Sequence, residues 1–217
     1  MKQQKMKLEK EIVKKLNLDY LLYLPENYNS KTEWPLILFL HGAGEVGNDL
    51  ELVKTQGLPK KLETDDGIPF IVVSPQCPNN ANWGILFDEL YELLQNIKEQ
   101  YKVNKKKVYL TGFSMGGFGT WAFSVKHTNE FAAIAPICGG LQNKNDVVKL
   151  KNTPVWTFHG MKDKVVPIDA TQRLVDLLKD CGGDIKFTKY PDLKHDSWTE
   201  TYNNLELYNW LLKYEIK

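Results

Sequence analysis

A serine flanked by glycines, Gly112-Phe-Ser-Met-Gly116, is the part of the sequence best suited to covalent chemistry. The run that begins at Val108 and leads into it is apolar and aromatic, which is typical of a buried strand. An amphipathic segment, Phe118–His127, follows directly. A strand, a serine turn and a helix in this order predict a nucleophile elbow, in which a strained turn exposes the hydroxyl of Ser114. A plain flexible loop is the alternative interpretation.

A serine hydroxyl becomes a useful nucleophile only when a base removes its proton. His195 is our predicted base, because imidazole exchanges protons near neutral pH. Asp163 is the predicted partner that bonds the other ring nitrogen and stabilises the imidazolium. Three other carboxylates compete, one expected at the start of a helix and two too near the base along its own loop: Asp169, Asp192 and Asp196.

The chain order Ser114, Asp163, His195 is that of the α/β-hydrolase triad. Three further motifs accompany the serine turn: His41-Gly-Ala-Gly-Glu45, the stretch from His159 to Pro167, and His195-Asp-Ser-Trp198. Between Tyr20 and Trp198 the chain therefore resembles the α/β-hydrolase superfamily. Within it, the chain is similar to the small carboxylesterases and predicted peptidases of the phospholipase/carboxylesterase and dienelactone-hydrolase type.

The resemblance implies where the oxyanion of a tetrahedral intermediate would be held. One donor is the backbone N–H of Met115, the residue after the serine. The second is the N–H of Ala43, with Gly44 as the runner-up, because small residues let the main chain approach the substrate. A plain glycine-rich turn is the alternative reading of this loop.

The remaining histidines have simpler explanations. We expect His41 and His159, each before a glycine at a strand end, to brace their loops through packing and backbone hydrogen bonds. His127 is expected to interact with the dipole at the end of a helix. His41, His159 and His195 lack the spacing of a metal site, so we predict neither a metal nor an organic cofactor.

Strand-like runs alternate with helical ones, which predicts an α/β fold with a doubly wound, mostly parallel sheet and helices on both faces. We expect one domain over 1–217, with 1–17 as a loosely attached arm, and the lysines 105–107 in a turn. The predicted strands are Asp19–Leu24, Trp34–Leu40, Phe70–Ser74, the run from Val108, Phe131–Ile137, Pro154–Gly160 and Asp184–Tyr190. The predicted helices are Phe87–Tyr101, Phe118–His127, Ile168–Cys181 and Thr199–Lys217, with a weak, interrupted pattern over Asp49–Leu62.

The connection 138–153 is too short for a large lid, so an open site for small, water-soluble esters is expected. Trp83 and Trp198 are candidate pocket walls together with Gly44, and aromatic walls would suit an aromatic acyl group such as feruloyl. Tryptophans that cap the core are an equally good reading of the two indoles.

Composition excludes several classes. In 217 residues, 28 basic and 27 acidic side chains leave a net charge of +1, which argues against nucleic acid or an anionic membrane as a partner. The three cysteines form no disulfide framework, and the charged first ten residues contain no apolar signal core. We therefore expect a cytoplasmic protein, with secretion after removal of a signal peptide as the alternative. Oligomeric state is left open.

The sequence thus predicts a serine carboxylic ester hydrolase that works through an acyl-enzyme. A peptidase or a thioesterase with the same triad is the first alternative, because the pocket and not the chemistry selects the leaving group. A non-catalytic, hydrolase-like binding protein is a more remote one.

Overall fold

The computed structural model describes residues 7, 9, 15–65 and 67–216. Its centre is a seven-stranded sheet in the order β1-β3-β2-β4-β5-β6-β7, in which β1 is antiparallel to β3 and the other neighbours are parallel. The predicted arm over 1–17 lies mostly outside the described residues. The mostly parallel α/β architecture is confirmed.

The strands are β1 Tyr20–Tyr23, β2 Trp34–Leu40, β3 Ile71–Pro75, β4 Val103–Phe113, β5 Ala133–Ile137, β6 Val155–Gly160 and β7 Ile185–Tyr190. The α-helices are α1 Gly57–Leu62, α2 Phe87–Gln100, α3 Met115–Lys126, α4 Asp169–Asp180, α5 Trp198–Asn203 and α6 Leu205–Leu211. Short 3-10 helices occupy Tyr28–Ser30, Ala43–Glu45, Leu50–Thr55, Trp83–Ile85 and Lys144–Leu150.

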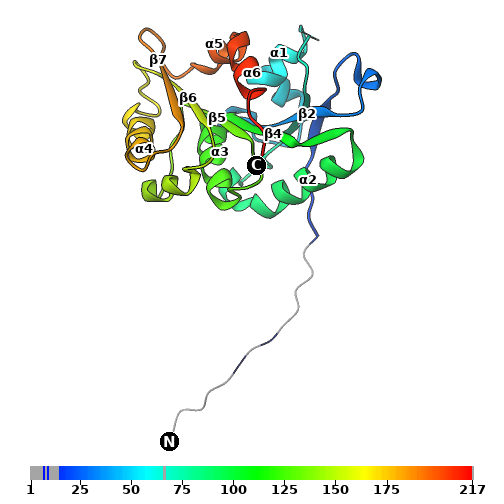
Figure 1. Cartoon of the computed structure of the whole chain (residues 1–217), viewed down its shortest axis with the longest axis horizontal. Helices are drawn as coiled ribbons and strands as arrows, with labels where there is room; N and C mark the ends of the chain where they lie inside the picture. Colours follow the sequence, from blue (N-terminus) through cyan, green and yellow to red (C-terminus); the bar gives the residue numbers. More distant parts are fainter. Residues whose placement is uncertain (1–6, 8, 10–14, 66, 217) are drawn as a thin grey trace, which may run out of the picture.

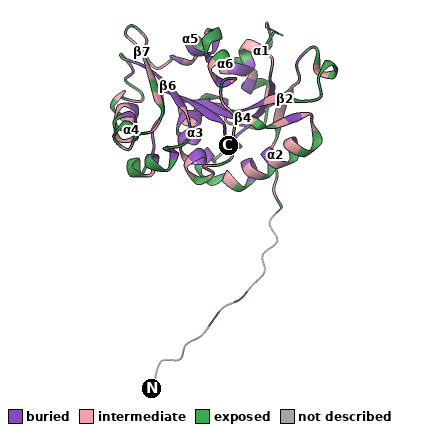
Figure 2. Ribbon diagram, in the orientation of Figure 1, coloured by how far each residue is buried: buried purple, intermediate pink, exposed green. Residues whose placement is uncertain are grey.

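Helices cover both faces of the sheet (Figure 1). One apolar core joins the sheet to α2, α3 and α4, and the other joins it to α1, α5 and α6. Strands β5 and β6 are buried along their length and β2 nearly so, as Figure 2 shows in purple. Their near-continuous apolar sequences follow from this covering, because neither face meets water.

Two sequence predictions about local structure are wrong. The lysines 105–107 do not form a turn; they lie inside β4, where the pairing with β2 slips between Trp34 and Leu36 and leaves Lys105 and Lys106 exposed. The predicted closing helix is two helices. Asn204 separates them, and its side chain accepts a hydrogen bond from the N–H of Glu206, which caps the start of α6.

The connection between β5 and β6 carries the 3-10 helix Lys144–Leu150, which packs against α3 and α4. The expected absence of a large lid at this point agrees with that short element. None of the helices formed by the described residues reaches the length and apolarity that a bilayer crossing requires.

The start of α3 lies in direct contact with the main chain at the ends of its neighbouring strands. A Cβ on Gly116 would overlap the carbonyl oxygen of Leu40 in β2, and one on Gly117 would overlap that of Ile137 in β5. Only glycine permits this approach. The first turn of α3 therefore packs directly against the main chain of the sheet.

We predict that Gly117→Ala lowers the free energy of unfolding by about 1–3 kcal/mol, the usual cost of overpacking a close contact. Gly44→Ala is the matched control, because a Cβ on Gly44 meets nothing within 4 Å. Urea denaturation of both variants provides the measurement. Equal stabilities for the two alanine variants would contradict the close approach of α3.

Candidate active site

Ser114 lies at the junction of β4 and α3 with φ 52° and ψ −118°. A non-glycine residue with positive φ is strained, by about 1–3 kcal/mol, and such strain concentrates at functional sites. A Cβ on Gly112 would lie 2.5 Å from Leu40 O and 2.6 Å from Gly116 O, so side chains two residues either side of the serine are excluded. The predicted elbow geometry is present.

Hydrogen bonds join the three predicted triad side chains in a row. His195 Nε2 lies 2.9 Å from Ser114 Oγ, and His195 Nδ1 lies 2.7 Å from Asp163 Oδ2. The three residues follow β4, β6 and β7, whose carboxyl ends meet at one edge of the sheet. Residues 81 positions apart in the chain are thereby in contact.

The Asp163 carboxylate is buried and fully engaged. Its Oδ1 accepts hydrogen bonds from the backbone N–H groups of Val165 and Val166, at 2.8 and 3.0 Å. Burial alone would raise the pKa of Asp163, but the hydrogen bonds from His195 and from the two backbone groups outweigh it and hold that pKa below its usual value. Asp163 is therefore a carboxylate at neutral pH and can face an imidazolium.

The competing carboxylates are occupied elsewhere. Asp192 pairs with Lys162 at 2.6 Å, and Asp196 accepts hydrogen bonds from the backbone and hydroxyl of Thr199. Asp169 is the first residue of α4, as predicted. Asp163 is the carboxylate bonded to His195.

His41 braces the loop that follows β2. Its Nε2 accepts from the N–H of Cys77 at 2.9 Å, so its proton is on Nδ1, which donates to Gly42 O at 2.6 Å. Burial lowers the pKa of His41 to about 4, although the bond to Gly42 acts in the opposite sense, so the ring is neutral. The predicted structural role of this histidine agrees with these contacts.

The bond from His41 also sets the orientation of the next peptide. All peptide bonds among the described residues are trans, so the Gly42 carbonyl and the Ala43 N–H point in opposite directions. Because the carbonyl is directed at the buried His41 ring, the N–H of Ala43 is directed away from it. Gly42, rather than Gly44, is the residue that must lack a side chain, since its Cβ would lie 2.6 Å from the Phe113 ring.

A cavity of about 420 Å³ opens beside the serine turn. Met115, Phe118, Gly119 and Ala122 form its α3 side, with the spacing of one helix face. The opposing residues are Asn82, Trp83, Gly84, Gly140 and Gln142. The cavity is mainly apolar and reaches the residue that follows Ser114.

The two candidate tryptophans differ in position. Trp83 is 1% exposed, donates to His41 O at 2.9 Å and also forms part of the cavity wall, so this indole packs in the core and borders the cavity. Trp198 stacks on Phe113 at 4.3 Å between ring centroids and meets His195 edge-on at 5.3 Å. Trp198 thus braces the base, and neither it nor Gly44 is among the residues lining the cavity.

Sequence reasoning missed most of the cavity residues: Asn82, Gly84, Phe118, Gly119, Ala122, Gly140 and Gln142. Counting three, four and seven positions on from Met115 along a helix identifies the α3 members, but nothing local indicates Gly140 or Gln142. The signal for those two lies in the tertiary packing of the β5 loop.

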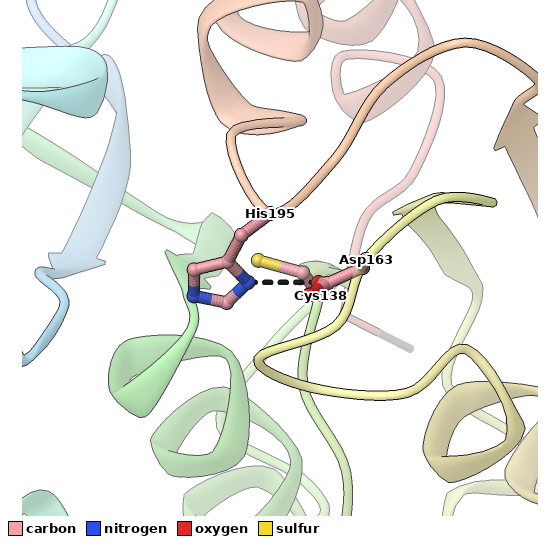
Figure 3. A group of neighbouring side chains, drawn as sticks. All are labelled: Cys138, Asp163 and His195. Atoms are coloured by element: carbon pink, nitrogen blue, oxygen red, sulfur yellow. Dashed lines mark hydrogen bonds and ion pairs between the residues drawn. The ribbon is translucent and has the colours of Figure 1, made fainter.

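Cys138 lies beside the His195–Asp163 pair (Figure 3). Donor atoms of the three residues all lie within 4.8 Å of one another, close enough for a metal ion. However, His195 Nδ1 and Asp163 Oδ2 are already bonded to each other, and burial raises the pKa of the Cys138 thiol to about 12. The arrangement favours proton transfer over metal binding.

The chain is similar in sequence to known esterases. Over 197 residues the chain is 27% identical to a bifunctional acetylxylan esterase/xylanase of Neocallimastix patriciarum, covering 88% of this chain and 28% of that protein. It is 29% identical over 161 residues to a probable feruloyl esterase C of Aspergillus oryzae, covering 70% of this chain and 57% of the relative. The chain thus spans only part of the length of these relatives.

Among solved structures, that of a thermostable esterase superposes with a TM-score of 0.77 at 32% identity, covering 91% of this chain and 59% of the other. Residues 86–208, more than half of the chain, match the family described as phospholipase/carboxylesterase. This segment contains Ser114, Asp163 and His195. The chain therefore belongs to the phospholipase/carboxylesterase family of α/β-hydrolases.

Proposed function

We propose that this protein is a serine carboxylic ester hydrolase that forms an acyl-enzyme on Ser114. The observation that carries the proposal is the hydrogen-bonded row Ser114–His195–Asp163, with the serine on a strained turn at the start of α3. The base lies within hydrogen-bond reach of the nucleophile on one side and of the orienting carboxylate on the other.

The chemistry follows from these contacts. Ser114 Oγ attacks the ester carbonyl carbon while His195 Nε2 takes the hydroxyl proton, and Asp163 stabilises the imidazolium through Nδ1–H. Collapse of the tetrahedral intermediate breaks the bond to the alcohol, which leaves with the proton from His195. Water then attacks the acyl-serine with His195 again acting as base. This step releases the carboxylic acid and regenerates free Ser114.

Two backbone donors are proposed for the oxyanion. Met115 is the first residue of α3, and the N–H groups of a helix's first turn have no partner within the helix. Ala43 is exposed, and its N–H is turned away from the buried His41 ring. Fixed dipoles of this kind stabilise the transition state without reorganisation.

The cavity beside Met115 is the proposed site for the acyl group. It is apolar, its volume of about 420 Å³ suits a medium-length or aromatic acyl group, and Trp83 and Phe118 place aromatic rings in its wall. The resemblance to a probable feruloyl esterase supports aromatic acyl esters as candidates. The short β5–β6 connection supports small, soluble esters, and strong activity on emulsified long-chain triglyceride would count against this part of the proposal.

One domain and a cytoplasmic location remain part of the proposal. Cys77, Cys138 and Cys181 are free thiols in the structure, which suits a reducing compartment.

We predict that Ser114→Ala lowers kcat by about a million-fold, the loss known for serine proteases without their nucleophile. A fluorophosphonate probe should label the wild-type protein at Ser114 and leave the variant unlabelled. Ser124→Ala is the matched control, because Ser124 lies on α3, the helix that follows Ser114, and donates to Thr120 O and Trp121 O, away from the site. Hydrolysis by the Ser114 variant at the wild-type rate would refute the mechanism.

We further predict turnover of short p-nitrophenyl esters and methyl ferulate, with no cleavage of a peptide anilide. The anilide and a thioester arm separate the ester hydrolase from the peptidase and thioesterase alternatives. Preferred cleavage of the anilide would indicate a peptidase, and preferred cleavage of the thioester would indicate a thioesterase. The absence of both probe labelling and turnover would favour a non-catalytic binding protein.

A third prediction concerns the cavity. Ala122→Phe should reduce kcat/KM by about tenfold or more for butyrate, octanoate and ferulate esters. The value for acetate esters should change little, because the new ring fills the space that only the larger acyl groups need. Ala122→Gly is the control and should retain the longer substrates. If the phenylalanine variant instead discriminates among alcohols at a constant acyl group, the cavity binds the alcohol.

A further inference from the structure

A second buried histidine stands behind the Asp163 carboxylate. His159, at the end of β6, is 0% exposed, and its Nε2 lies 3.3 Å from Asp163 Oδ2, the same oxygen that accepts from His195. His159 Nε2 also lies 2.8 Å from Val166 O. The row of the triad therefore continues beyond the carboxylate.

The contacts determine where the proton of His159 is. Both groups near Nε2, a carbonyl and a carboxylate, accept hydrogen bonds and cannot donate, so Nε2 carries the hydrogen. On the other side, Nδ1 lies 2.8 Å from the hydroxyl of Thr171. Burial lowers the pKa of His159, with the hydrogen bond to Val166 and the Asp163 carboxylate opposing the shift, so the neutral ring donates through Nε2. The Thr171 hydroxyl beside Nδ1 donates its hydrogen to Gly139 O.

The same contacts tie together the turn that holds Asp163. The carbonyl of Val166 accepts from His159 Nε2, and the N–H of Val166 donates to Asp163 Oδ1. The ring and the carboxylate are therefore both hydrogen-bonded to the main chain of one residue. Thr171 belongs to α4, and its hydroxyl also lies 2.7 Å from Gly139 O after β5. His159 thus anchors the Asp163 turn to two other elements of the fold.

We propose that His159 is a positioning residue: its Nε2–H fixes the Asp163 carboxylate and moderates the attraction of that carboxylate for the protonated form of His195. This inference rests on the proposed esterase function. An N–H dipole whose nitrogen lies 3.3 Å from Oδ2 lowers the negative potential at the oxygen that faces His195. Without it, the carboxylate would hold a protonated base more strongly and would be less well fixed in orientation.

The titratable groups that face this ring are few. Asp163 lies against Nε2, and His195 lies beyond it. The Cys138 thiol approaches Asp163 and His195 from the end of β5, and burial raises its pKa to about 12, so it is uncharged. From α4, the neutral Thr171 hydroxyl faces Nδ1.

The test uses two isosteres. His159→Gln places an amide N–H near the position of Nε2 and keeps the donor, whereas His159→Asn places its amide near Nδ1 and loses it. For His159→Asn we expect kcat per fluorophosphonate-titrated site to fall about tenfold, as misplaced catalytic geometry does. The acidic limb of its pH profile of kcat/KM should move upward by about 0.5 pH unit, less than a full charged hydrogen bond would produce. For His159→Gln, kcat per titrated site should stay within about threefold of the wild-type value. The acidic limb of its kcat/KM profile should stay within about 0.2 pH unit of the wild-type position.

His127→Asn is the control for loss of a histidine. His127 lies at the end of α3 and stacks on Tyr91, so its substitution should leave the acidic limb unmoved. A limb that stays in place in both His159 variants, or moves equally in both, would overturn the inference. Lack of labelling and turnover in the wild-type protein would instead overturn the proposed function and this inference with it.

If His159→Asn does not fold, NMR of the wild-type protein with ¹⁵N-labelled histidine decides the matter. The inference requires a protonated Nε2 on His159 throughout the active pH range. A proton on Nδ1 alone would overturn the inference.

Discussion

The structure depends on the close approach of the first turn of α3 to the main chain of the sheet. Gly116 and Gly117 meet the carbonyls of Leu40 and Ile137 so closely that neither position has room for a Cβ. This contact places the N-terminus of α3 directly at the end of β4 and forces Ser114 into positive φ. The strain is offset by two apolar cores that hold helices against both faces of the sheet.

Around this fixed serine, main-chain partners satisfy most of the polar atoms of His41, His159 and Asp163. His41 and His159 are neutral histidines that each bond to the carbonyl of a loop residue, Gly42 and Val166 respectively. Asp163 receives donors on both oxygens. A buried charge is costly unless it is hydrogen-bonded, so these contacts explain how a carboxylate remains ionised behind His195.

Sequence patterns predicted the strands well because buried parallel strands need unbroken apolar runs; β2 begins and ends where predicted. They failed where composition misleads. The lysines 105–107 suggested a turn, yet exposed backbone at a register slip accommodates charged side chains within β4. Asn204 ends one helix and caps the next, and the apolar periodicity of the closing segment continues across it, so the interruption carried little signal.

The sequence by itself determined the sheet class, the strained serine turn and the identity of three residues that meet 32 and 81 positions apart in the chain. Those features follow from local requirements: glycine where the backbone is crowded and apolar runs where strands are covered. Tertiary structure alone decided that Gly42 rather than Gly44 is the crowded glycine, that Trp83 forms a wall while Trp198 braces the base, and that His159 stands behind Asp163. These outcomes depend on which side chains from distant elements meet at the same point. No local sequence pattern encodes such long-range contacts.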